Sequence, residues 1–217
     1  MPVDVRSWRG SAAGFHARSV PEPAARALWV FEVDRPALVL GSSQPLAHVD
    51  ADACAAAGVE IVRRRSGGGA VLLRPGEVVW FDVIVPRDVL AAAGVVDDVA
   101  ASMVWFGRHV ADALGGLGVE ATVHDGPMVR PPWSGHVCFA GLGPGECSTA
   151  TGKLVGISQR RTRGAARFQC AVHTRWAPHE LVALLARPLP TGELPGVATV
   201  PADVAADVSA VVADELA

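Results

Sequence analysis

The stretch RRRSGGGAV (63–71) follows a β-branched apolar run, VEIVRR (59–64). Its three successive glycines carry no Cβ atom, so the backbone can adopt positive φ angles and approach a ligand closely. Successive exposed N–H groups form a concave anion site, and Ser66 adds a hydroxyl donor. Flanking arginines supply charge-assisted hydrogen bonds. The stretch therefore predicts a phosphate- or carboxylate-binding loop after a strand; the alternative is a flexible turn.

Two common phosphate-binding motifs do not describe this loop. No GK[ST] follows it, so it is not a Walker loop, and it does not fit GxGxxG. The chemistry therefore depends on what lies beside the loop in the folded chain.

A second stretch, TGKLVGISQRR (151–161), contains Lys153, the single lysine among 19 lysine and arginine residues. Lysine carries a compact ammonium with a movable pKa, whereas arginine carries a planar, permanently charged guanidinium. A site that holds one ammonium against a phosphate or a reacting carbonyl favours lysine. Lys153 is therefore a candidate catalytic residue, the alternative being an ordinary surface lysine.

The apolar patterns around these stretches predict an α+β domain. Alternation over 77–85 puts apolar side chains on both faces, which is typical of a central strand. Most expected strands adjoin one another and helices intervene irregularly, which favours α+β over a βαβ repeat. The expected strands are 28–33, 37–41, 59–64, 119–124, 137–140, 153–161 and 167–172, with 70–73 and 77–85 as a hairpin. The expected helices are 51–57, 97–116, 179–187 and 202–216.

Composition narrows the class of protein. Half of the residues are hydrophobic and 19% are charged, which predicts a buried core and excludes a disordered chain. The net charge of −3 gives no general attraction to nucleic acid or to anionic membranes. The N-terminus MPVDVRSWRG has no apolar signal region, and the four cysteines have no zinc spacing. We expect a cytoplasmic protein with reduced thiols, no membrane span and no nucleic-acid partner.

RRRSGGGAV and GKLVGISQRR together resemble the catalytic domain of the lipoate–protein ligase family, which is related to biotin–protein ligases. ALVLGSSQ (37–44) also resembles the first strand and turn of that family, so the resemblance spans roughly 28–175. It implies a single catalytic domain over 1–217, with a mixed sheet flanked by helices as in class II synthetases. It also implies that an accessory C-terminal domain is absent, which some relatives supply as a separate chain.

The resemblance further implies a reaction. Lys153 would contact the acyl carboxylate and the α-phosphate of an acyl-adenylate formed from ATP, with Mg²⁺ bridging phosphate oxygens. The acid would be lipoic or octanoic acid, and the acceptor a lysine of a lipoyl-domain protein. The implied substrate-binding residues are Arg64, Ser66, Gly67, Gly68, Gly69, Ala70 and Gly156.

The chain departs from the family pattern at several positions. Leu73 stands where the family has a histidine, and Glu77 stands where an asparagine helps to hold the metal. A carboxylate can ligate Mg²⁺, so Glu77 is the candidate metal ligand. The family's Phe-His-His-Gly becomes FQCA (168–171). These changes leave open a degenerate member that binds an acyl group without turnover.

A second branch of the superfamily is also similar. Certain cysteine-dependent octanoyltransferases have a Cys-Phe pair, a glutamate eight residues after the cysteine and a lysine seven residues after that glutamate. Cys138-Phe139, Glu146 and Lys153 have this spacing. A thiolate beside Lys153 would carry the acyl group as a thioester, taken from an acyl-carrier protein. However, Gly143 and Gly145 replace the Ser-x-Tyr of that branch, and Gly69 follows the ligases.

Two further residues have open roles. Asp82 lies on the expected central strand, where an acid costs free energy unless it is paired. It is either a site residue or a partner of one of the arginine clusters. His173 lies close in sequence to the Lys153 strand and could reach the same pocket.

Overall fold

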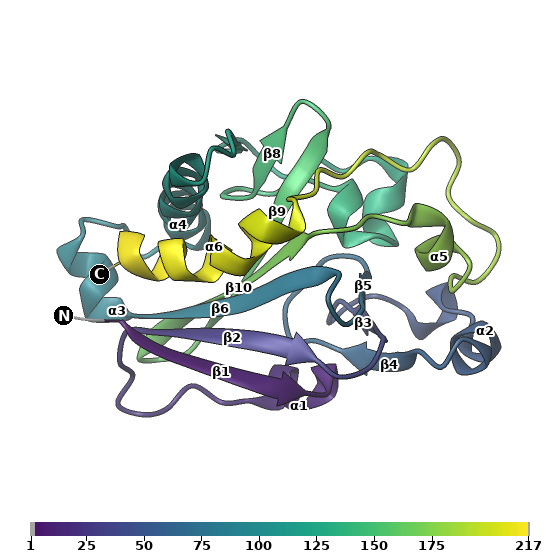
Figure 1. Ribbon diagram of the computed structural model, residues 1–217, viewed down its shortest axis with the longest axis horizontal. Helices are drawn as coiled ribbons and strands as arrows, with labels where there is room; N and C mark the ends of the chain where they lie inside the picture. Colours follow the sequence, from purple (N-terminus) through teal and green to yellow (C-terminus); the bar gives the residue numbers. More distant parts are fainter. Residues whose placement is uncertain (1–2, 217) are drawn as a thin grey trace.

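Strands far apart in the sequence form the two sheets of the computed structural model, which describes residues 3–216 (Figure 1). The larger sheet has the order β1-β2-β6-β10-β9-β8-β7, and the smaller one has the order β4-β3-β5. Only β1 and β2 run parallel in the larger sheet, so it is mixed. The strands of the larger sheet are β1 (Asp4–Gly10), β2 (Ala27–Val33), β6 (Val78–Pro86), β7 (Thr122–Val123), β8 (Cys147–Thr149), β9 (Gly152–Arg161) and β10 (Ala165–His173). Those of the smaller sheet are β3 (Ala37–Leu40), β4 (Glu60–Arg63) and β5 (Val71–Leu73).

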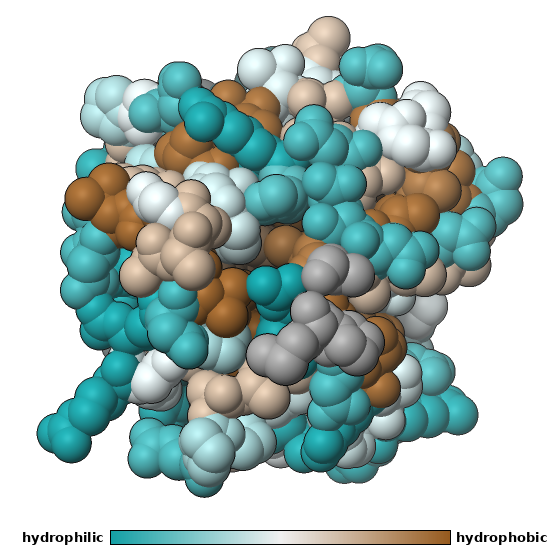
Figure 2. Space-filling model, turned by 90° about the vertical axis from the view of Figure 1, so that its left-hand side faces the viewer, coloured by the Kyte–Doolittle hydropathy of each residue, from teal (hydrophilic) through white to brown (hydrophobic). Residues whose placement is uncertain are grey.

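Helices pack against both sheets (Figure 1). The α-helices are α1 (Ala12–Ala17), α2 (Ala51–Ala56), α3 (Arg87–Ala92), α4 (Val99–Gly116), α5 (Pro178–Val182) and α6 (Ala202–Glu215). Three 3₁₀ turns are η1 (Leu46–His48), η2 (Pro132–Gly135) and η3 (Cys138–Ala140). Among the described residues, no helix combines the length and the apolar character needed to cross a membrane. Figure 2 shows a mostly hydrophilic face with apolar residues in separate small groups.

The central strand β6 has the two apolar faces that its sequence predicts. Phe81, Val83 and Val85 pack with α4 and α6 in one core cluster. Trp80 and Ile84 pack in a second cluster, between the larger sheet and the smaller one. The α+β prediction is therefore confirmed, and the second cluster is where the site is built.

Helix α4 begins and ends close to its predicted bounds. The Asp98 side chain accepts a hydrogen bond from the Ala101 amide at 2.8 Å, which caps the first turn. Met103, Phe106, Val110 and Leu114 of the predicted stripe are buried, and the Phe106 ring stacks on Phe168 at 4.3 Å. Val99, the first member of the stripe, is 53% exposed.

The predicted hairpin of 70–73 with 77–85 is wrong. β5 pairs with β3 in the smaller sheet, whereas β6 pairs with β2 and β10 in the larger one. The chain passes from one sheet to the other through a turn in which Gly76 has a φ of 74°. Adjacent apolar runs cannot reveal this crossing, because either partner strand would satisfy the same alternation.

Three other boundaries differ from the expectation. Residues 137–140 form a 3₁₀ turn rather than a strand, since a run of four apolar residues does not distinguish the two. The strand expected over 119–124 is only Thr122–Val123, and the helix expected over 179–187 is only Pro178–Val182. The elements β1, α1 and α3 were not predicted.

Candidate active site

The glycine loop has the backbone conformation that its sequence predicts. Gly68 has a φ of 100°, in the left-handed region that favours glycine. A Cβ on Gly69 would lie 2.6 Å from the Val137 backbone nitrogen, so a larger residue has no room there. Within residues 3–216, the amides of Gly67, Gly68 and Gly69 donate no hydrogen bond. Three successive free amides are what an anion-binding loop requires.

Arg64 stabilises the conformation of this loop. Its side chain is buried and its Nη2 donates to the carbonyls of Gly67 at 2.7 Å and Gly69 at 3.0 Å. Nη1 donates to the Val39 carbonyl at 3.2 Å. The guanidinium therefore binds carbonyl oxygens of the loop. The positive charge that was expected near a phosphate is thus partly engaged in stabilising the loop conformation.

Lys153 is buried and paired with Glu146. Its Nζ lies 2.8 and 2.9 Å from the two carboxylate oxygens, and 2.9 Å from the carbonyl oxygens of both Cys138 and Gly141. Glu146 also accepts from the amides of Gly143 at 2.7 Å and Ile157 at 3.1 Å. An ammonium has three protons, so the four acceptors around Nζ compete for them.

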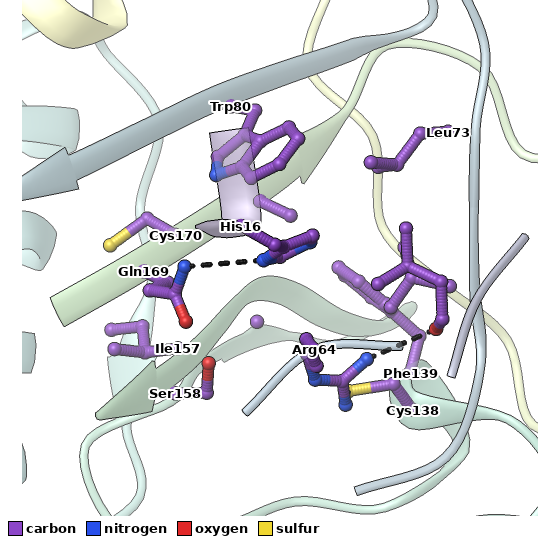
Figure 3. Close-up of a pocket in the computed structure, with 14 residues that line it drawn as sticks. His16, Arg64, Leu73, Trp80, Cys138, Phe139, Ile157, Ser158, Gln169 and Cys170 are labelled. Carbon is purple, nitrogen blue, oxygen red and sulfur yellow. Dashed lines mark hydrogen bonds between the residues drawn. The ribbon is translucent and has the colours of Figure 1, made fainter. Parts of the chain in front are cut away.

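Two cavities meet beside this ion pair. The larger one, of about 820 Å³, is called the polar cavity because its wall includes the charged side chains of Lys153, Glu146 and Arg130 beside the glycine loop. The smaller one, of about 60 Å³, is mostly apolar and lies between β3 and β5 of the smaller sheet and β6, β9 and β10 of the larger one (Figure 3). Cys138, Ile157 and Ser158 line both cavities, so they mark the junction.

The Cys138 thiol occupies this junction. Its Sγ lies 3.7 Å from Arg64 Nη2 (Figure 3). Its own carbonyl accepts from Lys153 Nζ at 2.9 Å. The predicted set Cys138, Glu146 and Lys153 is therefore brought together. Across the junction, the Ser158 hydroxyl donates to that of Ser66 at 3.0 Å, which joins β9 to the glycine loop.

Ala70 and Gly156 have supporting positions. Ala70 is buried, its amide donates to the His136 carbonyl at 2.8 Å, and its carbonyl accepts from the Cys138 amide at 2.9 Å. It lines neither cavity and fixes the loop to η3. Gly156 lines the apolar cavity, where a Cβ would lie 3.0 Å from the Phe139 ring.

Glu77 lies apart from the other predicted site residues. Both of its carboxylate oxygens accept from Arg175 Nη1 at 3.0 Å, and it lines a small cavity that lacks Lys153. In the described part of the chain, no group of three His, Cys, Asp or Glu residues is placed to hold a metal ion. The described residues therefore do not fit a protein-bound Mg²⁺ ion.

The open roles of Asp82 and His173 can now be assigned. Asp82 is fully buried and pairs with Arg167, whose Nε donates to it at 2.6 Å. His173 is buried behind Phe139, with ring centroids 4.5 Å apart, and lines the small Glu77 cavity rather than either cavity of the site. Burial and the Lys153 charge lower the pKa of His173 to about 4, so its ring is neutral.

Sequence reasoning missed three lining residues of the apolar cavity: His16 on α1, Trp80 on β6 and Gln169 on β10. The pKa of His16 is lowered to about 3 by burial and by the charges of Arg64 and Arg167. Nothing in the sequence around His16 indicates that it reaches a site. The only signal for Gln169 is its place in FQCA, where the family has a histidine.

Comparison with known proteins gives relatives for this arrangement. The family model for the lipoyl protein ligase A/B catalytic domain matches residues 15–215, whereas no curated protein sequence matches the chain. Protein Ta0514 from T. acidophilum, solved with bound lipoic acid, is similar at a TM-score of 0.76 and 19% identity, over 100% of this chain and 86% of that one.

Two further solved structures share the fold. Lipoate-protein ligase A bound with ATP has a TM-score of 0.73 and 18% identity, over 100% of this chain and 86% of that one. A bi-partite lipoate protein ligase from Thermoplasma acidophilum, described with its E2 lipoyl domain, has a TM-score of 0.70 and 18% identity, over 100% of this chain and 84% of that one. Because the family model covers nearly all of the described residues, the chain belongs to the lipoyl protein ligase A/B catalytic domain family.

Proposed function

We propose that this protein attaches a lipoyl or octanoyl group to a lysine of a lipoyl-domain protein through an acyl-adenylate made from ATP. The observation that carries the proposal is the pair of joined cavities. An apolar slot suits an acyl tail, and a polar cavity with three free loop amides suits a phosphate. The relatives named above bind lipoic acid or ATP, and we extend both ligands to this chain.

The first step forms the mixed anhydride. The acid places its tail between the two sheets and its carboxylate at the junction of Cys138, Ile157 and Ser158. A carboxylate oxygen attacks the α-phosphorus of ATP, the bond to the bridging oxygen breaks, and pyrophosphate leaves. The amides of Gly67, Gly68 and Gly69 donate to the phosphate oxygens and need no reorganisation, because they are already unpaired.

The second step transfers the acyl group. The neutral amine of the acceptor lysine attacks the acyl carbon, the bond to the phosphate oxygen breaks, and AMP leaves while the amine loses a proton. The E2 lipoyl domain described with the archaeal relative supports an acceptor of this class.

Lys153 would stabilise negative charge in both steps. Its Nζ already has more acceptors than protons, so an entering carboxylate or phosphate oxygen can replace one of them without leaving the ammonium unpaired. Arg130 adds a second positive charge to the wall of the polar cavity.

A second function, cysteine-dependent acyl transfer, is favoured by one observation. Cys138 Sγ lies at the junction of the cavities, 3.7 Å from a guanidinium that would stabilise a thiolate. The thiolate would attack the thioester of an octanoyl-carrier protein and release the carrier thiol. The acceptor amine would then attack the new thioester and release Cys138.

Intact-mass spectrometry of an apo lipoyl domain tests both functions. One reaction contains lipoate or octanoate with ATP and Mg²⁺, and the other contains octanoyl-carrier protein without ATP. We expect modification only with ATP, retained by Cys138→Ser and lost in Lys153→Met. Cys54→Ser is the matched control, because its thiol is buried on α2, outside both cavities.

Three results would contradict the ligase. Modification only from the carrier, lost in Cys138→Ser, assigns the transferase. Equal modification by Lys153→Met and the wild type removes Lys153 from the reaction. No modification under either condition favours a protein that binds an acyl group without turnover.

A further inference from the structure

The polar cavity opens to solvent, and exposed residues form its mouth. Gly67 and Gly68 of the glycine loop, Val99 at the start of α4, and Arg130 all line this cavity and are all exposed. Lys153 lines the same cavity but is buried. A protein that delivers one of its side chains to Lys153 must therefore cover this mouth.

Exposed large apolar side chains are concentrated at the mouth. Among residues 3–216, the exposed members of this class are Val5, Leu46, Val96, Val99 and Val129. Val99 lines the polar cavity, and Leu46 and Val129 each directly follow a residue that lines it. Single exposed apolar residues are ordinary, but three of these five at one opening indicate a contact surface.

The backbone is ordered at all three positions. The Leu46 carbonyl accepts from the Val49 amide at 2.9 Å within η1. The Val129 amide donates to the Leu142 carbonyl at 2.8 Å, and its carbonyl accepts from the Leu142 amide at 3.2 Å. Val99 is the first residue of α4. A backbone that is already ordered adds no ordering cost when a partner binds.

Two positive charges beside the mouth are free, although the whole chain has a net charge of −3. Arg65 precedes Ser66 of the cavity wall, and Arg130 is part of that wall; both are exposed. Neither has a hydrogen bond or an ion pair with any residue that the structure describes. The acid on this wall, Asp98, caps α4. A partner that places carboxylates against the two arginines would gain specificity and a faster association.

We propose that the mouth of the polar cavity, formed by Leu46, Val99 and Val129 with Arg65 and Arg130, is the docking surface for the acceptor domain. The domain would cover the three apolar side chains with apolar residues of its own and set carboxylates against the arginines. Its lysine would extend between them to the junction of the two cavities. This inference rests on the proposed function, because that function requires a lysine of another protein to enter this cavity.

Leu46 and Val129 are the residues that test the docking surface, since both are exposed and neither lines a cavity of the site. Leu46→Glu and Val129→Glu each place a charge where the partner is apolar. An unpaired charge in the centre of an interface is unfavourable, so we expect each variant to bind the acceptor about tenfold more weakly.

Val5→Glu is the matched control. Val5 is 54% exposed and makes the same change of side chain. It lies on β1 at the edge of the larger sheet, with β2, β6 and β10 between it and the strand that carries Lys153. This variant should bind the acceptor as the wild type does.

A titration followed by nuclear magnetic resonance measures docking without turnover. An isotopically labelled apo E2 lipoyl domain is titrated with the whole unlabelled protein, and the shifts of its amide signals give the dissociation constant. We expect the largest shifts around the acceptor lysine. Pyrophosphate release from ATP and octanoate, measured without an acceptor, should be equal in the wild type and all three variants.

The outcomes separate this inference from the proposed function. Equal binding by the wild type, Leu46→Glu and Val129→Glu would overturn the inference and leave the ligase proposal standing. An equal loss in Val5→Glu would also overturn it, because added negative charge at any place would then suffice. If the wild type does not bind the domain, the inference is wrong, and the intact-mass assay decides the ligase proposal by itself.

Two further results would contradict docking at this surface. Loss of pyrophosphate release together with acceptor binding would mean that Leu46 and Val129 shape the cavity itself. Sedimentation velocity gives the other: a wild-type dimer that Leu46→Glu dissociates would mean that the exposed apolar residues join two copies of this chain.

Discussion

Two ion pairs among the described residues, Asp82 with Arg167 and Glu146 with Lys153, are buried but are built differently. The Asp82 pair is sealed: every contact described for its carboxylate goes to a protein donor, and its arginine fixes α1. The Glu146 pair lines the polar cavity, and its ammonium has a surplus of acceptors.

The difference indicates a division of roles. A sealed pair can only hold its neighbours in place, so its contribution to function is the shape of the cavity wall. A pair at a cavity wall with spare acceptors can exchange a partner for a ligand. We therefore expect damage to the first pair to appear mainly in stability, and damage to the second mainly in ligand binding.

The largest expected effect comes from breaking the sealed pair. Arg167→Met leaves the Asp82 carboxylate buried without its cation, which costs about 3–5 kcal/mol of unfolding free energy. Urea unfolding measures this loss. The matched control is Arg9→Met, because Arg9 pairs with Glu32 at 3.5 Å on the surface, where a change below about 0.5 kcal/mol is expected. Equal losses in the two variants would contradict the sealed description.

The next effect is a dependence of stability on pH, because a histidine lies near each ion pair. The pKa of His173, near Lys153, is about 4 in the folded protein, below the ordinary histidine value of 6.5. The unfolded chain therefore binds a proton at a higher pH than the folded one. Stability should fall as the pH drops below 6.5, and this contribution should level off below about pH 4.

Between pH 6.5 and 5 the loss from His173 is about 2 kcal/mol. Urea unfolding at several pH values measures it, and His173→Gln should show a smaller fall over the same range. The fall in stability that remains in His173→Gln should include a contribution from His16. The pKa of His16 is lowered to about 3, mainly by burial and further by the charges of Arg64 and Arg167. An unchanged slope in His173→Gln would show that the ring is protonated in the folded state.

A double-mutant cycle on Glu146 and Lys153 tests whether the second pair serves stability. Glu146→Leu alone leaves a buried ammonium without its carboxylate, at a cost of about 2 kcal/mol. The double variant Glu146→Leu with Lys153→Met removes both charges and should recover part of that loss. We expect it to remain inactive in the acyl-transfer assay. Recovery of activity along with stability would remove Lys153 from the chemistry.

The sequence was most informative where chemistry restricts the residue type. The loop 63–71 and the lone Lys153 were selected from the sequence because glycine and lysine have physical properties that other residues lack, and the fold brings both to the wall of one cavity. The spacing of Cys138, Glu146 and Lys153 also predicted three residues that are in contact. The central strand and the long helix followed from periodicity.

The features that the sequence did not predict depend on contacts between residues far apart in the chain. The separation of β5 from β6 into two sheets is decided by the strands that they pair with. An apolar run in the sequence does not indicate which strand that is. Glu77 follows the glycine loop closely in sequence, but the same crossing takes it to Arg175 instead of Lys153. His16 reaches the cavity on α1, which is held in place by Arg167, far along the chain.

The smallest expected effect tests whether Lys153 can exchange its partner Glu146 for an anionic ligand. Pyrophosphate is the probe, and calorimetry gives its affinity for the polar cavity. Glu146→Gln removes the charge that competes for the ammonium, so pyrophosphate should bind about tenfold more tightly, a change of about 1.4 kcal/mol.

Asp98→Asn is the control that isolates the pair. Asp98 lines the same cavity and its substitution changes the net charge equally, but its carboxylate does not contact Lys153, and asparagine also caps a helix. It should strengthen pyrophosphate binding only slightly, through long-range charge. Equal gains in both variants would mean that any lost negative charge suffices. No gain in Glu146→Gln would mean that Lys153 is a tether between β9 and the loop 138–146, as fixed as the sealed pair, and that the loop amides alone bind the anion.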